Sequence, residues 1–472
     1  MQMTNTRIDF RANVQRVPPR IPFATFKNTR TALIKRAEVV GLLGEEYWEQ
    51  LRQAGHDLRL HAVTHLDEYL PMLEDKVVQA GGQVRWARDA AEARAIVLDI
   101  AAQHNVKRVV KVKSMVSEEI ELNTSLAEAG IHASETDLGE YIVQLAGERP
   151  SHITAPALHM TKEEIAALFE QKLAVTAPPD PKILTEIART RLREEFLSAE
   201  MGISGGNFLI AETGTLVLAT NEGNGRMCMV LPPVHVAIVG IEKVIPDWES
   251  LTVLLKLLAR SATGQKITTY NTFITGVGER GPKEFHLVLL DNGRTRILSD
   301  DKARETLLCI RCGACMNVCP VYNNVGGHAY GWVYPGPIGA ILTPQLLGTA
   351  LASNLPFASS LCGACADVCP VKIPIPEILL HLRHRAVEGD RFEKQPVAPF
   401  TVRVGAKMGA SALGALWLYR FGSKVLGVIQ VPFRRGDWLP ALPPPLNRWT
   451  MSRPLLAFRN EFRTWWKKRG RS

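Results

Sequence analysis

Cysteine spacing is the strongest chemical signal in this sequence. Seven of the eight cysteines lie between Cys309 and Cys369, and they form two runs. The first run is C-x2-C-x2-C-x3-C-P, ending at Pro320, and the second is C-x2-C-x3-C-P, from Cys362 to Pro370. Thiolates at the first spacing hold cubane clusters in two-cluster ferredoxins, and the last cysteine of that run ligates the other cluster. The sequence therefore predicts two [4Fe-4S] clusters and one-electron transfer.

The crossed ligation rule assigns each cysteine to a cluster. Cluster one takes three ligands from the first run and one from the second, namely Cys309, Cys312, Cys315 and Cys369. Cluster two takes three ligands from both runs, namely Cys319, Cys362 and Cys365. A complete second run would have another cysteine at position 359, where this chain has Ser359. The fourth iron of cluster two is then held by an oxygen ligand, with Ser359 and Ser360 as local candidates, or by a partner's group, or it is absent.

Zinc is the competing interpretation, because paired C-x2-C units also make zinc sites. A zinc ion takes four ligands and has no need of the longer run that begins at Cys309. The eighth cysteine, Cys228, stands alone between Met227 and Met229 and is expected to be a small buried hydrophobe. The cysteine pattern thus favours iron–sulfur clusters over zinc.

The residues before Cys309 must supply the scaffold that positions these ligands. Helical and strand-like patterns alternate from about Thr25 to Gly293. The expected helices are 89–104, 117–129 and 248–262, and the expected strands are 107–112, 216–219, 234–239 and 285–290. This alternation predicts an α/β layer fold with a largely parallel sheet. Short helices are expected in the cysteine segment that follows.

Several motifs outside the cysteine runs resemble those of a known family. They are IAETGT at 210–215, NEGNGR at 221–226, LPPVH at 231–235, GIEK at 240–243 and YGWVYPGP at 330–337. The first four are similar to the signature of the lactate utilisation (LUD) domain. Together with the cysteine runs, they make nearly the whole chain similar to the lactate utilisation protein B family.

This resemblance implies a domain order, a function and partners. Residues 1–299 are expected to form a LUD α/β domain with an N-terminal helical extension and a fold like sugar-phosphate isomerases and CoA transferases. Residues 300–388 are expected to form an α-helical two-cluster ferredoxin-like domain, and residues 389–472 a basic C-terminal helical tail. The family implies an iron–sulfur subunit of a three-protein system that oxidises L-lactate to pyruvate. The implied partners are a cysteine-rich subunit and a second LUD-domain subunit.

A ligand pocket is expected where strands of the α/β domain end. The Gly-broken polar loop at 221–226 follows a strand, so Arg226 is a candidate to hold a carboxylate in bidentate fashion. His235 is a candidate base, and Lys113 follows another strand and adds positive charge. The competing interpretation is a structural loop with His235 as a hydrogen-bonded core histidine, because a fold alone does not give a function.

Charge is unevenly distributed along the chain, whose formal net charge is +9. Residues 401–472 carry 14 Lys and Arg but only two acidic residues, Asp437 and Glu461. From Phe458 onward, basic side chains are interleaved with aromatic side chains. A helix of this composition can lie on an anionic membrane surface, dock onto a partner or remain solvated. No recognised nucleic-acid module accompanies the charge, so nucleic acid is not expected as a partner.

Targeting signals favour the cytoplasm. The first residues lack the apolar region of a secretory signal, and the longest apolar run near the C-terminus, 408–419, is too short to span a bilayer. We therefore expect a cytoplasmic location, with the basic tail available for contact with the cytoplasmic face of a membrane.

The overall expectation is a redox subunit of an L-lactate-oxidising complex. No flavin or nicotinamide fingerprint is visible, so the sequence identifies neither the electron donor nor the acceptor. One alternative is an autonomous isomerase-like or transferase-like enzyme in the LUD pocket, with clusters that regulate or stabilise it. Another is an electron relay for a different dehydrogenase, acting on glycolate or another 2-hydroxy acid or on glycerol phosphate.

Overall fold

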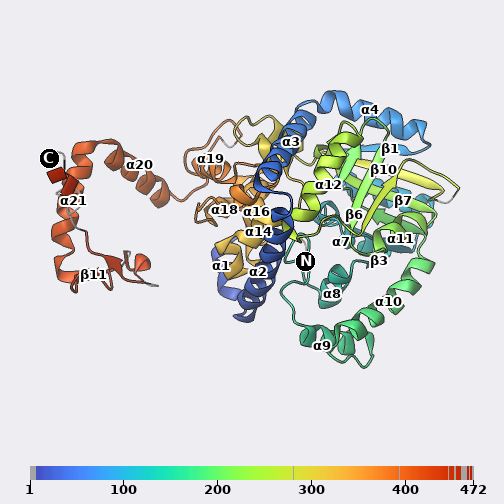
Figure 1. Cartoon of the computed structure of the whole chain (residues 1–472), viewed down its shortest axis with the longest axis horizontal. Coiled ribbons are helices and arrows are strands. Elements are labelled where there is room, and N and C mark those ends of the chain that lie inside the picture. Colours follow the sequence, from blue (N-terminus) through green and yellow to red (C-terminus); the bar gives the residue numbers. More distant parts are fainter. Residues whose placement is uncertain are drawn as a thin grey trace. The chain divides into compact units, whose positions relative to one another are not determined.

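The computed structural model describes residues 7–279, 281–392, 394–444, 446–450, 453–458, 465–466 and 468–469. The chain divides into two compact units, Met1–Gln395 and Pro396–Ser472 (Figure 1). The first unit contains the α/β domain and all eight cysteines. The cysteine segment and the α/β domain therefore belong to one body.

A six-stranded sheet forms the centre of the α/β domain, and every neighbouring pair of strands runs parallel. The order of the strands is β1 (Gln83–Ala87), β10 (Glu284–Leu290), β7 (Val234–Gly240), β4 (Met201–Ser204), β2 (Arg108–Lys111) and β3 (His132–Glu135). The apolar strand β7 is buried along its whole length, as expected for a parallel strand covered on both faces. The predicted parallel α/β fold is confirmed, and so are the strands expected at 107–112, 234–239 and 285–290.

The path of the chain through this sheet reverses between β2 and β4. From β2 the chain moves outward to the edge strand β3, then returns to β4 and continues the other way through β7 to β10. Such a reversal leaves a crevice outside the carboxyl ends of the two strands, which is where ligands bind in open α/β sheets. The ends of β2 and β4, at Lys111 and Ser204, therefore mark the expected ligand position.

A second, smaller sheet is mainly antiparallel. Its strands follow the order β8 (Val244–Ile245), β5 (Phe208–Ile210), β6 (Thr215–Thr220) and β9 (Tyr270–Ile274). Strand β6 confirms the strand expected at 216–219, but it runs antiparallel to both neighbours and lies outside the parallel sheet. Sheet membership depends on pairing partners, which the composition of one strand does not encode.

Two helices of the α/β domain follow their local capping signals. Helices α5 (Ala90–Gln103) and α12 (Trp248–Ala262) confirm the helices expected at 89–104 and 248–262. The side chains of Asp89 and Asp247 cap them by accepting backbone N–H groups of the first turn.

The helix expected at 117–129 is instead two short helices, α6 (Met115–Glu119) and α7 (Leu122–Glu128). Glu121 has a left-handed φ of 52°, which interrupts the helical hydrogen-bond pattern between them. The remaining helices of this domain are α4 (Leu66–Gln79), α8 (Leu138–Ala146), α9 (Lys162–Leu173), α10 (Pro181–Ser198), α11 (Asn224–Val230) and α13 (Arg294–Leu298).

The cysteine segment shares a buried apolar core with the α/β domain. Cys309, Cys312 and Cys365 belong to the same cluster of buried residues as Trp48 and Leu254. The N-terminal helices α1 (Phe10–Arg16), α2 (Arg20–Gly41) and α3 (Glu45–Thr64) pack against this segment. The segment itself contains α14 (Ala314–Val318), α15 (Pro320–Val325), α16 (Gly336–Leu347), α17 (Thr349–Ala352), α18 (Ala364–Val368) and α19 (Ile375–Glu388).

The second unit contains α20 (Phe400–Gly414), α21 (Leu416–Ile429) and a short antiparallel pair, β11 (Trp438–Leu439) with β12 (Leu455–Leu456). Among the described residues, no single helix has the length and hydropathy to cross a membrane, and α20 with α21 meets that test only as a pair bent by 106°. Of the basic aromatic tail expected from Phe458 onward, 459–464, 467 and 470–472 lie outside the described residues.

Candidate metal centre and adjoining cavity

The first cysteine loop is a tight turn that leads into a short helix. Arg311 and Gly313 on either side of Cys312 have left-handed φ values of 60° and 90°. This turn brings the Arg311 N–H to within 3.4 Å of Cys309 Sγ. Helix α14 follows directly and ends at Cys319, so cysteines on both sides of the turn are fixed by local backbone geometry.

Both runs end at a cysteine whose sulfur accepts a backbone hydrogen bond. Cys319 caps α15, with the Tyr322 N–H 3.5 Å from Sγ and Pro320 at the first helical position, where proline is favoured. Cys369 Sγ accepts the Ile373 N–H at 3.4 Å, and its carbonyl oxygen accepts Arg52 Nε at 2.9 Å. Hydrogen bonds to cysteine sulfur are a main influence on the potential of iron–sulfur clusters.

The thiols interact in two sets. Burial is the largest cause that raises the pKa of Cys312, and the neighbouring Cys309 and Cys369 raise it further. Burial also raises the pKa of Cys369, and Cys309 raises it further. The second set links the remaining cysteines. Burial, followed by the neighbouring Cys319 and Cys362, raises the pKa of Cys365 to about 12.

Cys315 belongs mainly to the first set. Burial raises the pKa of its thiol well above the ordinary value, and the charged neighbours that raise it further are Cys309, Cys312, Cys365 and Cys369. Buried thiols this close together lose their protons only when a positive centre compensates the thiolate charge, so this donor set fits a bound metal centre.

A cavity of about 550 Å³ lies at the reversal point of the parallel sheet. Residues 112–116 after β2 and 205–207 after β4 form one part of its wall, and residues 310–312 of the first cysteine loop form another. Gly205 is needed at this position, because a Cβ atom there would lie 2.6 Å from Ser114 Oγ. The cavity of the α/β domain and the first cysteine loop therefore share a wall at Cys312.

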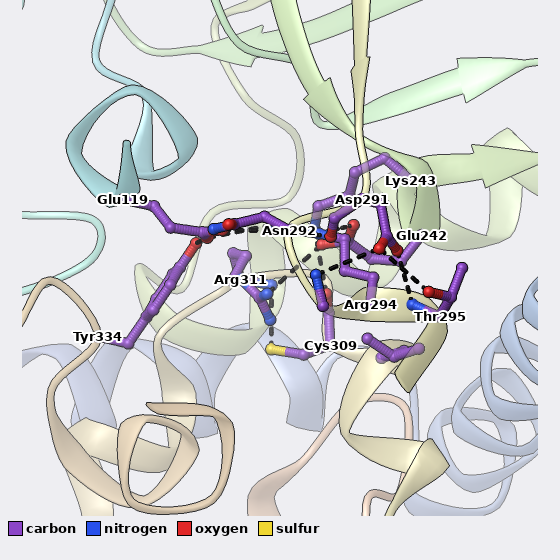
Figure 2. Close-up of polar contacts among 12 residues, drawn as sticks. Glu119, Glu242, Lys243, Asp291, Asn292, Arg294, Thr295, Cys309, Arg311 and Tyr334 are labelled. Atoms are coloured by element: carbon purple, nitrogen blue, oxygen red, sulfur yellow. Dashed lines mark hydrogen bonds and ion pairs between the residues drawn. The ribbon is translucent and has the colours of Figure 1, made fainter. Parts of the chain in front are cut away.

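A buried ion network joins the carboxyl ends of the sheet strands to the first cysteine loop (Figure 2). Arg294, which follows β10, donates to Glu119 at 2.9 and 3.0 Å and to Glu242 at 2.6 Å. Arg311 lies 3.5 Å from Glu242, and the Tyr334 O–H donates to Glu119 at 2.6 Å. Because Arg294 and both carboxylates are at most 1% exposed, these charges depend on one another.

Two further cations surround the first loop. Lys243 Nζ donates to the Cys309 carbonyl oxygen at 3.2 Å and also lines the cavity. Burial, followed by repulsion from Arg311, lowers the pKa of Lys243 to about 7. Arg59 donates to the Leu307 carbonyl oxygen at 3.1 Å, and burial lowers its pKa to about 10. Two buried basic side chains thus donate hydrogen bonds to backbone carbonyl groups at the start of the first loop.

Two buried polar atoms in residues that line the cavity have no hydrogen-bond partner among the described residues. One is the donor Arg311 Nη1, and the other is the acceptor Asn224 Oδ1. The Arg311 side chain is 10% exposed, and Asn224 is 6% exposed. An unpaired buried donor and acceptor are destabilising unless water or a ligand satisfies them.

The structure brings one of the three predicted pocket residues to the cavity. Lys113 lines it, and Lys113 Nζ contacts Glu140 at 3.1 Å. Arg226 is exposed on α11, 5.9 Å from the ring centre of Tyr270, and does not line the cavity. The prediction of a loop at 221–226 is wrong in part, because helix α11 begins at Asn224.

His235 occupies the core of the parallel sheet. It is 0% exposed, its Nε2 lies 2.8 Å from Ser204 Oγ, and its ring stacks on Phe285. Burial, followed by repulsion from His286, lowers its pKa to about 3. This is the hydrogen-bonded core histidine of the competing interpretation, and it lies outside the cavity wall.

Sequence reasoning missed Arg311, Lys243 and Asn224. Each stands inside a motif that the sequence had already marked, in the first cysteine run, in GIEK and in NEGNGR. Their adjacency arises only when strand ends from distant parts of the chain meet at one edge of the sheet.

Comparisons with known proteins agree with this architecture. A LUD domain model matches residues 70–290, and a 4Fe-4S dicluster domain model matches residues 305–373. Lactate utilization protein B of Shouchella clausii (strain KSM-K16) is 46% identical over 428 residues, covering 89% of each chain. The protein of the same name from Bacillus pumilus (strain SAFR-032) is 46% identical over 427 residues, with 89% of each chain covered. This chain belongs to the lactate utilization protein B family.

Family membership confirms the resemblance seen in the motifs. The chain is an iron–sulfur member of a lactate-utilisation family, with an N-terminal LUD domain followed by a 4Fe-4S dicluster domain. A DUF162 family protein from Deinococcus radiodurans aligns with a TM-score of 0.29 and 13% identity, covering 48% of this chain and 98% of its own.

Proposed function

We propose that this chain is the iron–sulfur electron-transfer subunit of a complex that oxidises L-lactate to pyruvate. Cysteines of both runs hold two [4Fe-4S] clusters in the crossed arrangement. Cluster one takes Cys309, Cys312, Cys315 and Cys369, and cluster two takes Cys319, Cys362 and Cys365. The two sets of interacting thiols support this assignment, and an interaction between Cys315 and Cys365 joins them.

The observation that carries the proposal is that Cys312 lines the LUD cavity. Oxidation of lactate to pyruvate releases two electrons and two protons. Bound clusters accept electrons one at a time, so two clusters accommodate both electrons of one turnover. The shared wall places a cluster ligand beside any substrate or carrier that the cavity holds.

The second cysteine loop faces solvent, and this supports a direction for the electrons. Cys362 is exposed, and Phe357 just before it is 45% exposed. Cys309 and Cys312 are only 9% exposed. We therefore assign the cavity side as the entry and the exposed loop as the exit toward a partner. The cysteine-rich subunit and the second LUD-domain subunit of the system are the proposed partners.

The cavity wall suits a 2-hydroxy acid or its oxidation product. Arg311 Nη1, a donor suited to a carboxylate oxygen, and Asn224 Oδ1, an acceptor suited to a hydroxyl group, have no hydrogen-bond partner among the described residues. Lys113 and Lys243 add positive charge to the same wall. Hydrogen bonds between a guanidinium and a carboxylate are charge-assisted and therefore strong. We propose Arg311 and Asn224 as the ligand contacts in place of Arg226 and His235.

An anaerobic reconstitution tests the electron-transfer role. The chain is assayed alone and with the other two proteins of the system, using L-lactate and an artificial acceptor, while bleaching of the clusters is followed in the visible range. Turnover and bleaching only in the mixture are expected. Turnover by the isolated chain would favour an autonomous enzyme, and bleaching by glycolate or glycerol phosphate but not lactate would favour a relay for another dehydrogenase.

We also propose that the C-terminal unit makes peripheral contact with the cytoplasmic face of a membrane. Large apolar side chains on its two helices are exposed, including Phe400 at 74%, Met408 at 68% and Trp417 at 70%. The surrounding sequence is rich in Lys and Arg. Co-sedimentation with anionic vesicles should fall as salt is added, because ionic screening weakens surface attraction. Equal binding to neutral vesicles would contradict the electrostatic part of this proposal.

A further inference from the structure

The two cysteine loops have the same backbone conformation, and equivalent positions lie 50 residues apart in the sequence, as Cys319 and Cys369 do. In the first loop, Arg311 and Gly313 have φ values of 60° and 90°. In the second loop, Leu361 and Gly363 have φ values of 55° and 88°. A left-handed non-glycine residue is uncommon, so its occurrence at matching positions marks a true structural repeat. This repeat aligns residue 309 with residue 359.

The helices that follow the two loops continue the repeat. Helix α14 (Ala314–Val318) corresponds to α18 (Ala364–Val368), and both contain five residues. Each helix ends at a cysteine followed by a proline. The alignment therefore holds on the C-terminal side of both loops, with no insertion or deletion.

The side chain at the aligned position makes the same contact in both loops. The Arg311 N–H lies 3.4 Å from Cys309 Sγ, and the Leu361 N–H lies 3.1 Å from Ser359 Oγ. In both loops, the backbone N–H of residue i+2 donates to the side-chain sulfur or oxygen of residue i. The Ser359 oxygen consequently has the position relative to its loop that a cluster-ligand sulfur has in the first loop.

Arg383 fixes the backbone of the second loop at this residue. Its Nη2 donates to the Ser359 carbonyl oxygen at 3.1 Å, and its Nε donates to the Pro356 carbonyl oxygen at 2.8 Å. The neighbouring Ser360 is different. It is exposed, and it aligns with Ile310, which ligates nothing in the crossed scheme.

We infer that Ser359 Oγ is the fourth protein ligand of cluster two. The inference rests on the proposed two-cluster ligation and selects among the alternatives that the sequence left open. On binding, the hydroxyl proton is released to solvent and the oxygen bonds to iron, without a change in the number of electrons. Oxygen is a harder and poorer ligand than thiolate for iron in a sulfide cluster, so this iron is the most labile in the chain.

Replacing serine by cysteine at two adjacent positions tests the inference. The full chain is purified anaerobically as wild type, Ser359→Cys, Ser360→Cys and Ser359→Ala. Iron and sulfide are counted, and conversion to a three-iron cluster on brief air exposure is followed by low-temperature EPR. Ser359→Cys should slow this conversion by about tenfold or more, because a thiolate completes the ligand set. Ser359→Ala should speed it, and Ser360→Cys should match wild type.

The opposite outcomes would contradict the serine assignment alone or together with the two-cluster proposal. Equal rates for Ser359→Cys and Ser360→Cys, or a wild-type rate for Ser359→Ala, would overturn the serine assignment while leaving the two-cluster proposal intact. Iron and sulfide for a single cluster in the wild-type chain would overturn the two-cluster proposal and the serine assignment together. Ser359→Ala keeps the test decisive even if Ser359→Cys does not fold.

Discussion

The two cysteine loops share one backbone but lie in opposite surroundings. The first is buried against the LUD cavity, with Lys243 and Arg311 beside it and Cys312 in the cavity wall. The second has an exposed cysteine, Cys362, and an exposed Phe357. Local spacing therefore decides that each loop can bind a cluster, whereas the tertiary environment decides what that cluster contacts.

Charge and solvent are the physical means by which these surroundings act. Positive charge near a cluster stabilises its reduced, more negative form, and solvent exposure also shifts its potential. The cations beside the first loop should make cluster one a good acceptor at the cavity. In the proposed arrangement, the exposed second loop would leave cluster two accessible to a partner and to oxygen.

Removing the last cysteine of either run should have the largest effect. Cys369→Ser should damage cluster one and Cys319→Ser should damage cluster two, because each of these cysteines faces the opposite loop in the crossed scheme. Iron should be lost from the damaged cluster, by up to about half of the total. A three-iron EPR signal formed in air should survive Cys369→Ser and vanish in Cys319→Ser. The reverse pattern would show that each run builds its own cluster.

Breaking the buried ion network should have the next largest effect, and only the first cysteine loop should be damaged. Arg294→Met leaves Glu119 and Glu242 buried without their main cation, which destabilises folding by about 3–5 kcal/mol. Urea unfolding measures the loss, and EPR should show damage to cluster one with cluster two retained.

A surface ion pair provides the matched control for that variant. Arg189 pairs with Glu186, and the two side chains are 74% and 57% exposed. Arg189→Met should change the free energy of unfolding by no more than about 1 kcal/mol. Similar effects of the two substitutions would show that the buried network does not hold the first loop in place.

Changing the cavity contact should affect ligand binding more than stability. Arg311→Lys keeps the positive charge but removes the unpaired Nη1 donor, so KM for lactate in the reconstituted system should rise about tenfold, with cluster content retained. Arg226→Ala should have little effect, because Arg226 is exposed outside the cavity. The sequence alone predicts that Arg226→Ala impairs oxidation, so the ranking of the two variants decides between the assignments.

The smallest effect concerns acid stability of the first loop. His152 packs against this loop, where its Nε2 lies 3.2 Å from Asn317 Oδ1. Burial, followed by repulsion from Lys113, lowers its pKa from 6.5 to about 4. Between these values the unfolded chain binds a proton that the folded chain does not, so stability is lost as pH falls below 6.5.

A histidine replacement measures this contribution. The loss assigned to His152 is about 1 kcal/mol between pH 7 and pH 5.5. His152→Gln should flatten the dependence of the urea midpoint on pH over this range. His384→Gln, at an exposed position, should leave the dependence unchanged. An unchanged slope in His152→Gln would show that another group causes the acid sensitivity.

Elements set by local signals were predictable from the sequence. The helices expected at 89–104 and 248–262 are confirmed, and Asp89 and Asp247 cap their first turns. Features that depend on distant partners were not predictable. Strand β6, for example, lies outside the parallel sheet and pairs with β5 and β9.

The sequence was enough to predict a 4Fe-4S segment, because ligand spacing within one turn is fixed by a few neighbouring residues. It also determined the parallel α/β class, through the alternation of apolar strands and amphipathic helices. The sequence did not reveal that His235 is buried, that Arg226 is exposed, or that Arg311 and Asn224 line one cavity. The reason is that the reversal of strand order gathers chain segments far apart in sequence at one sheet edge, and no local pattern encodes which side chains meet there.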